Sequence, residues 1–112
     1  MNECYTEDNT PYDIIISDAA LAMLDTHIDF LAKVSVKAAQ RLADDIIGDI
    51  RSLSANPGRF PMYENRFITD NRYHKMLSAK RYLVLYEIDQ YTVAVDYIVD
   101  CRQDYEWLIA KE

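Results

Sequence analysis

Glycine, proline and cysteine are all scarce in this chain of 112 residues, which has two glycines, three prolines and two cysteines. The low glycine and proline content argues against collagen-like, low-complexity and disordered classes. Half of the residues are hydrophobic, which indicates a globular domain. Cys4 and Cys101 permit at most one disulfide, so we expect reduced thiols rather than a disulfide framework.

Long hydrophobic runs are missing too. No apolar run approaches the roughly 18 residues that a membrane span needs, and residues 1–11 (MNECYTEDNTP) hold three acids and no base, unlike a signal peptide. We therefore expect a cytoplasmic protein with no membrane contact. Residues 1–11 are predicted to form an acidic, flexible extension and residues 12–112 a single domain, because compact domains commonly hold about 100–150 residues.

Positive charge is scarce overall but concentrated in one segment. The net charge of -7 argues against a generic nucleic-acid binder, because contacts with phosphates need lysine and arginine. Residues 59–81, however, hold six of the twelve lysines and arginines and only two acids. Such a run is either a binding patch or a solvated surface that protects a sheet edge, and both interpretations stay open. The two histidines, His27 and His74, lie far apart and predict no metal site.

The first half of the chain predicts a strand and two helices. Tyr12–Ser17 is short and β-branched, as strands are. Apolar residues then recur at helical spacing after Ser17 and again after Ser35, each serine being a suitable N-cap. The first helix is predicted to end near Lys33 and the second at the Asn56-Pro57-Gly58 break. Two helices joined by about two residues must form an antiparallel hairpin.

After this break the hydrophobic period changes to two. Residues 72–77, 82–89 and 91–99 are predicted strands of an antiparallel meander, with Asp89-Gln90 as a turn, and residues 104–110 are a possible closing helix. The predicted fold class is α+β: an N-terminal strand and an antiparallel helical hairpin packed on a small antiparallel sheet.

Four stretches of the chain follow a known pattern in order and spacing: YDIIISDAALAML, LSANPGRFP, YHKMLSAKRYLVLYEID and VAVDYIVDCRQDY. With the order of the elements, they make residues 12–109 resemble the RelE/ParE superfamily of bacterial type II toxin–antitoxin toxins, also described as plasmid stabilisation proteins. The resemblance implies a cognate antitoxin as partner and no metal or other cofactor.

The superfamily shares a fold but not a target. One branch cuts messenger RNA on the ribosome, another poisons DNA gyrase without being a nuclease, and some members have no demonstrated toxicity. We predict metal-independent cleavage of messenger RNA at the ribosome, with a gyrase-directed toxin as the close alternative. An antitoxin-binding protein without catalytic activity is a third interpretation.

The resemblance also implies catalytic residues. Arg102 matches the C-terminal arginine of the superfamily, and Tyr105 matches a tyrosine of one nuclease subgroup that has a histidine in place of Asp104. RNA cleavage of this kind uses the 2′-hydroxyl of the RNA as nucleophile, so the protein must supply a base, a charge stabiliser and an acid. We predict Arg102, Tyr105 and Lys75 for these tasks, with Glu64 as the nearest acid able to act as a base.

A binding surface for RNA or antitoxin is predicted at Arg59, Arg66, Arg72, Tyr73, His74, Lys80 and Arg81. The superfamily commonly has tyrosine, arginine and lysine where this chain has Tyr73-His74-Lys75, so a permanent charge becomes one that titrates near pH 6.5. Tyr73 or Tyr82 is predicted to stack on an exposed base. We further expect Lys75 or Arg81 to open onto one concavity with Arg102, because a phosphate site needs several donors close together.

Structural roles are the competing interpretation of several of these residues. Arg102 is flanked by Asp100 and Asp104 and could be ion-paired with them. Strand tyrosines such as Tyr82 are expected to fill the core or the open face of the sheet, together with Tyr86 and Tyr97. His27 is predicted to be an exposed helix residue, and Cys101 a small buried one.

Overall fold

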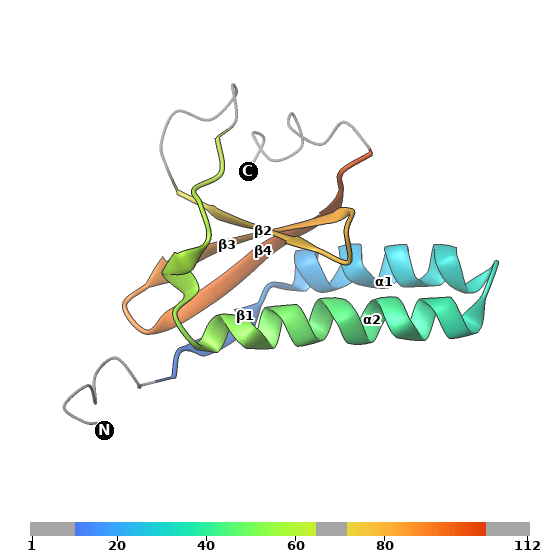
Figure 1. The fold of residues 1–112 in the computed structure, drawn as a ribbon, viewed down its shortest axis with the longest axis horizontal. Coiled ribbons are helices and arrows are strands. Elements are labelled where there is room, and N and C mark those ends of the chain that lie inside the picture. The colour runs from blue at the N-terminus through green and yellow to red at the C-terminus, as the bar shows by residue number, and fades with distance from the viewer. Residues whose placement is uncertain (1–10, 65–71, 103–112) are drawn as a thin grey trace.

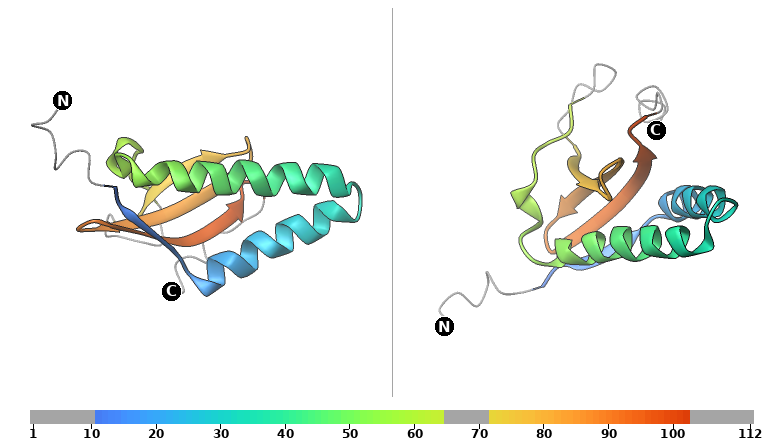
Figure 2. Two further views of the ribbon diagram at one scale, coloured as in Figure 1. Left: turned by 90° about the horizontal axis from the view of Figure 1, so that it is seen from below. Right: turned by 45° about the vertical axis from the view of Figure 1, so that its right-hand side comes forward.

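The structure is a computed structural model that describes residues 11–64 and 72–102. Its elements are β1 (Asp13–Ile16), α1 (Asp18–Ala32), α2 (Val36–Arg51), the short 3-10 turns η3 (Ser52–Ser54) and η4 (Pro57–Arg59), β2 (His74–Ser78), β3 (Tyr82–Asp89) and β4 (Thr92–Asp100). Figures 1 and 2 show α1 and α2 as an antiparallel hairpin that covers one face of the sheet. The predicted α+β fold is confirmed.

Both helices begin at the predicted serines. The side-chain oxygen of Ser17 accepts a hydrogen bond from the backbone N–H of Ala20 at 3.0 Å, and that of Ser35 accepts one from Ala38 at 3.1 Å. Each serine thereby satisfies one of the backbone donors that a helix leaves unpaired at its start. The second helix ends at Arg51, earlier than predicted, and continues as the 3-10 turn η3.

The sheet has four strands in the order β1-β4-β3-β2. The antiparallel pairing of β2 with β3 and of β3 with β4 confirms the predicted meander. β1 joins this meander in parallel beside β4, from Asp13 opposite Thr92 to Ile16 opposite Val95, so the sheet is mixed rather than purely antiparallel. The turn between β3 and β4 consists of Gln90 and Tyr91, one residue later than predicted.

A bulge in β4 determines which side chains face the helices. Leu85 pairs with Tyr97 but Tyr86 pairs with Val95, so Asp96 is an extra residue opposite β3. On the helix side, the core includes buried residues of α1, α2 and the strands: Leu24, Ile46, Ile50, Met76, Val84, Tyr86, Val95 and Ile98. A second cluster lies on the other face: Tyr63, Tyr73, Leu83, Leu85, Tyr97 and Val99.

The residues after η4 run along the outer edge of β2. The backbone N–H of Tyr63 donates to the carbonyl of Tyr73 at 2.7 Å, and that of Lys75 donates to Pro61 at 2.9 Å. These bonds protect the first half of the edge strand. None of the helices within residues 11–64 and 72–102 has the length and apolarity that a membrane span requires. Residues 1–10 of the predicted extension (residues 1–11) and the predicted closing helix at 104–110 lie outside the described residues.

Candidate functional site

A pocket of about 260 Å³ lies between α1 and the adjoining ends of β3 and β4. We call it the arginine pocket, and its lining residues are Thr26, His27 and Phe30 of α1, Arg81 and Tyr82, and Asp100 and Arg102. Tyr82 and Asp100 are opposite each other in the β3–β4 register. Arg81 comes directly before Tyr82 and Arg102 two residues after Asp100, so this pairing brings the two arginines together. The prediction that Arg81 and Arg102 open onto one concavity is therefore confirmed.

Asp100 pairs with both arginines. The Nε of Arg102 donates to its Oδ1 at 3.2 Å, the Nη2 of Arg102 donates to its Oδ2 at 3.0 Å, and the Nε of Arg81 lies 3.9 Å from Oδ2. Burial by itself would raise the pKa of Asp100, but the hydrogen bonds and charge of Arg102, with the charge of Arg81, outweigh it and hold this pKa below its ordinary value. The ion pair expected as the structural interpretation of Arg102 is confirmed for Asp100.

Arg81 is fixed by the turn that precedes it. Its backbone N–H donates to Ser78, its carbonyl accepts from the N–H of Cys101 at 2.8 Å, and its Nη2 donates to the hydroxyl of Tyr82 at 2.8 Å. The Nε of Arg81 is buried and has no hydrogen-bond partner in the described part of the chain. The distance of 3.9 Å to Asp100 is an ion-pair contact but too long for a hydrogen bond.

His27 is part of the pocket, so its prediction as an exposed helix residue was wrong. Its Nε2 donates to the backbone carbonyl of Ile98 at 2.9 Å, since a carbonyl can only accept. Its ring lies 4.8 Å from that of Tyr82. The sequence carried a signal for this placement, because position 27 is three residues after Leu24 and therefore on the same apolar face. Cys101, predicted to be buried, is exposed.

Two arginines of the predicted binding surface make internal contacts elsewhere. The guanidinium of Arg59 donates to the carbonyls of Ala55 at 2.6 Å and Asn56 at 3.0 Å and packs over the ring of Phe60. Arg72 forms an ion pair with Glu87. Neither arginine lines the arginine pocket. Arg66 of the predicted binding surface and Tyr105 of the predicted catalytic residues lie outside the described residues.

Tyr73 and His74 are held within the fold. The ring of Tyr73 is only 3% exposed, and its hydroxyl donates to Asp96 at 2.9 Å. Burial and this hydrogen bond both raise the pKa of Tyr73. The Nδ1 of His74 donates to the carbonyl of Phe60 at 2.8 Å, and its ring stacks on that of Tyr86. The predicted stacking of Tyr73 or Tyr82 on an RNA base does not fit their burial, since Tyr82 is only 2% exposed.

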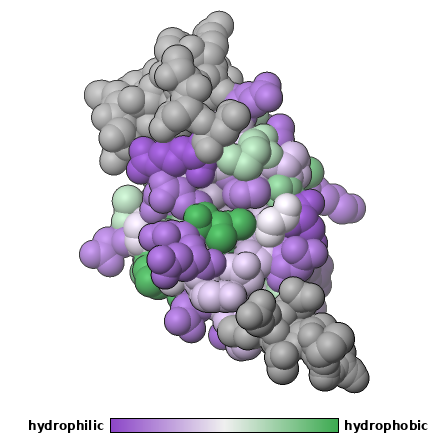
Figure 3. All heavy atoms as spheres, turned by 90° about the vertical axis from the view of Figure 1, so that its left-hand side faces the viewer, coloured by the Kyte–Doolittle hydropathy of each residue, from purple (hydrophilic) through white to green (hydrophobic). Residues whose placement is uncertain are grey.

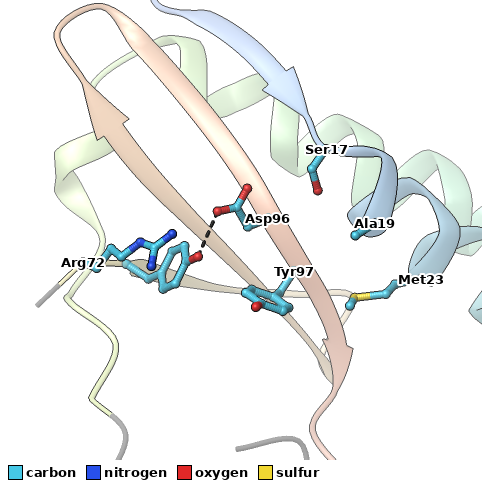
Figure 4. Close-up of a pocket in the computed structure, with 7 residues that line it drawn as sticks. Ser17, Ala19, Met23, Arg72, Asp96 and Tyr97 are labelled. Atoms are coloured by element: carbon cyan, nitrogen blue, oxygen red, sulfur yellow. Dashed lines mark hydrogen bonds between the residues drawn. The ribbon is translucent and has the colours of Figure 1, made fainter. Parts of the chain in front are cut away.

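A second pocket, of about 230 Å³, lies between the start of α1 and the bulge of β4. Figure 4 shows Ser17, Ala19 and Met23 on the helix side and Arg72, Asp96 and Tyr97 on the sheet side. Its polar groups satisfy one another, as in the hydrogen bond from Tyr73 to Asp96 (Figure 4). We therefore interpret it as a packing gap beside the bulge rather than as a reactive site.

The remaining predicted residues are dispersed. Lys75 is opposite Leu85 and belongs to the face of β2 that points away from the helices. Lys80 lines a shallow pocket against α2, and Glu64 is exposed near the β2 edge. Within residues 11–64 and 72–102, no three His, Cys, Asp or Glu side chains are close enough together to hold a metal ion.

Comparison with known proteins assigns the chain to a family. A family model described as the ParE toxin of the type II toxin–antitoxin system, parDE, matches residues 14–105. The chain belongs to the ParE toxin family. It is thus the toxin of a type II toxin–antitoxin system, and its partner is a cognate antitoxin. The match includes Arg81, Asp100 and Arg102, so the whole described arginine pocket lies within the family's range.

A solved structure has the same fold. The chain is similar to a chain of the chromosomal ParDE toxin–antitoxin system from P. aeruginosa, with a TM-score of 0.66 and 12% sequence identity. The similarity covers 82% of this chain and 98% of that one. At this identity the likeness concerns the fold alone. A comparison with curated proteins finds no match.

Proposed function

We propose that this ParE-family toxin arrests growth by binding DNA gyrase and does not cut messenger RNA. The observation that carries the proposal is the occupation of Arg102, whose guanidinium meets both carboxylate oxygens of Asp100 at 3.2 and 3.0 Å. A stabiliser of the transition state must direct its donors to the place where the negative charge develops. Here the Nε and Nη2 donors of Arg102 face an ionised carboxylate of the protein itself and not an open position.

The separation of the other candidate groups supports the same proposal. Cleavage needs a base, a charge stabiliser and an acid around one phosphate, within hydrogen-bond reach of it. Lys75 belongs to the sheet face opposite the helices, whereas Arg102 lines a pocket against α1. Arg59 and Arg72 are engaged in the contacts described above. Gyrase is the target that the superfamily offers for a toxin without nuclease chemistry, and it implies action in the cytoplasm.

The test compares the two targets in purified systems. We expect the protein to block supercoiling of relaxed plasmid by DNA gyrase with ATP, and to leave ribosome-bound messenger RNA uncut. A variant with Ile46→Asp, which places a charge at a fully buried core position, is the inactive control. Cut messenger RNA together with unimpaired supercoiling would overturn the proposal.

Ribosome-dependent cleavage is the second candidate function, because Arg81 and Arg102 do line one pocket. In that case Arg102→Ala should reduce cleavage about 10²-fold or more while the fold stays intact, as when one electrostatic stabiliser is removed from an active site. Mapping of messenger RNA ends after induction in a bacterium measures this. Unchanged ends in cells that have stopped growing would exclude it.

A further inference from the structure

We propose that the arginine pocket binds the carboxylate of an acidic side chain in a partner polypeptide, while Phe30 contacts an apolar side chain beside that acid. The proposal rests on the proposed function, since it assumes that the toxin acts through protein contacts. It adds to that function a site, a ligand chemistry and the residues His27, Phe30 and Asp100, for which the sequence predicted no binding role.

The first observation is a donor that lacks an acceptor. The Nε of Arg81 is buried without a hydrogen-bond partner among the described residues, although its Nη2 donates to Tyr82 at 2.8 Å. Buried donors in folded proteins nearly always have a partner, and the nearest acceptor to this one is Asp100 at 3.9 Å, so internal hydrogen bonds do not saturate the guanidinium of Arg81. A carboxylate is the acceptor that best matches a guanidinium, because its two oxygens can receive parallel N–H bonds.

The second observation is the charge of the pocket. Arg81 and Arg102 carry two positive charges and Asp100 one negative charge, so one positive charge is left over. One carboxylate neutralises this excess. A nucleic-acid backbone needs a row of bases to neutralise successive phosphates, and this pocket offers only two arginines. The charge therefore favours an acidic peptide over RNA or DNA.

The third observation is the apolar wall. Phe30 lines the pocket and is 67% exposed, and the neighbouring helix turn exposes Val34 to 81% and Val36 to 65%. The end of the molecule that carries the β3–β4 turn shows hydrophilic side chains around a small central apolar patch (Figure 3). Large apolar side chains exposed in one place commonly mark a contact with another protein. A partner that places an apolar residue next to an acid would cover both parts of this surface.

The test uses a minimal probe and observes the arginine directly. The folded protein, labelled with ¹⁵N, is titrated with the dipeptide N-acetyl-Leu-Glu-amide while the arginine Nε–H signals are recorded. We expect the signals of Arg81 and Arg102 to shift in a saturable manner. N-acetyl-Leu-Gln-amide, which has the same shape without the charge, should leave them in place. The RNA dinucleotide ApA, which carries the same single negative charge, is the third probe and should not bind more tightly than the glutamate dipeptide.

Variants separate the pocket from general effects. Arg102→Gln should weaken dipeptide binding about tenfold, the cost of one lost charge-assisted hydrogen bond. Arg51→Gln, at the exposed end of α2, should not change it. Phe30→Ser should weaken binding and Leu77→Ser, on the sheet face away from the helices, should not, although the side chains are 67% and 59% exposed. Thermal unfolding of each variant establishes that it is folded.

Two results would overturn the inference. One is equal binding of the glutamate and glutamine dipeptides, and the other is tighter binding of ApA than of the glutamate dipeptide. Neither result depends on gyrase. Loss of dipeptide binding with intact gyrase inhibition would reject the pocket and keep the proposed function, and the reverse outcome would reject the function and keep the pocket.

Discussion

At the scale of single residues, Arg59 illustrates how a basic side chain can serve the fold. Its guanidinium donates to carbonyls of the link between η3 and η4, at 2.6 Å to Ala55 and 3.0 Å to Asn56, and to the side chain of Ser52 at 3.1 Å. These bonds join η4 to the start of η3. The geometry thus gives Arg59 a structural role in this link rather than a role in binding phosphate.

We expect Arg59→Gln to lower the free energy of unfolding by about 1 kcal/mol, the usual net value of a few partly exposed hydrogen bonds. Growth arrest at matched protein level should be unchanged. Urea denaturation measures the first effect and an induction assay the second. A stable variant that has lost its toxicity would instead support the predicted binding role.

Tyr86 should make stability sensitive to alkali. Its ring is fully buried, its hydroxyl donates to the carbonyl of Pro57 at 2.6 Å, and burial raises the pKa of Tyr86 to about 12. The unfolded chain releases this proton near pH 10 while the folded protein keeps it, so stability is complete below pH 10 and falls between pH 10 and 12 by about 1.4 kcal/mol per pH unit.

The substitution Tyr86→Phe should remove part of this decline and, at neutral pH, cost about 1 kcal/mol for the unpaired carbonyl. Denaturant midpoints between pH 8 and 11 measure both effects. Identical slopes in the two proteins would show that Tyr86 does not control the alkaline limit.

Asp100 should make the stability of the protein sensitive to acid. Its pKa is held below the ordinary value by Arg102 and Arg81 despite burial. The stabilisation is therefore complete above the unfolded pKa, about 3.9, and is lost as the pH falls through the lower folded value. Asp100→Asn should be less stable than the parent at pH 7 and lose less stability on acidification to pH 3. Circular dichroism at both pH values measures this, and parallel losses would contradict it.

At the scale of elements, the turn between β2 and β3 has an unusual composition. Ala79 and Lys80, the first two of the three residues between β2 and β3, have φ values of 52° and 69°, in the left-handed region that glycine or asparagine usually occupies. The turn places Arg81 at the arginine pocket. Its strain is tolerated because the flanking strands pair along their full length, from Ser78 opposite Tyr82 to His74 opposite Tyr86.

We expect Lys80→Gly to raise the free energy of unfolding by about 1 kcal/mol, because glycine adopts positive φ without steric cost. Lys75→Gly in the adjoining strand is the matched control and should destabilise the protein. Thermal melts of both variants test the sign. A destabilised Lys80→Gly would mean that contacts of the lysine side chain outweigh the backbone strain.

At the scale of the whole molecule, the charge is unbalanced. The net charge of -7 on 112 residues produces self-repulsion in the compact state, which salt screens over a Debye length of about 10 Å at 0.1 M. We expect the melting temperature to rise as sodium chloride is increased from low concentration to about 0.15 M. Calorimetry measures this, and a fall would indicate that attractive pairs such as those of Asp100 dominate the electrostatics.

The sequence predicted the positions of the helices and strands better than it predicted which of them pair in the fold. Hydrophobic periodicity and the serines at 17 and 35 located both helices, and alternation located the meander. The parallel pairing of β1 with β4 joins residues about 80 apart, and no local pattern encodes it. The site was predicted in part. Arg81 and Arg102 line one pocket as expected, but His27 also lines it, because the fold brings its ring to the carbonyl of Ile98. The partner of Arg72 is Glu87, 15 residues away, which only the fold brings near, whereas Arg59 bonds to carbonyls three and four residues before it.

The bulge at Asp96 also indicates where this strand tolerates a change of length. Val93, Val95, Ile98 and Asp100 all face the helix side, a series whose alternation breaks only across Asp96. A deletion of Asp96 would therefore leave every later residue on its present face, with Tyr97 still opposite Leu85. A deletion at position 98 or 99 that is absorbed by straightening the bulge would instead place Tyr97 opposite Val84 and turn it to the helix side, because side chains alternate along a strand. Relatives of this toxin that differ in length here are thus expected to differ at position 96.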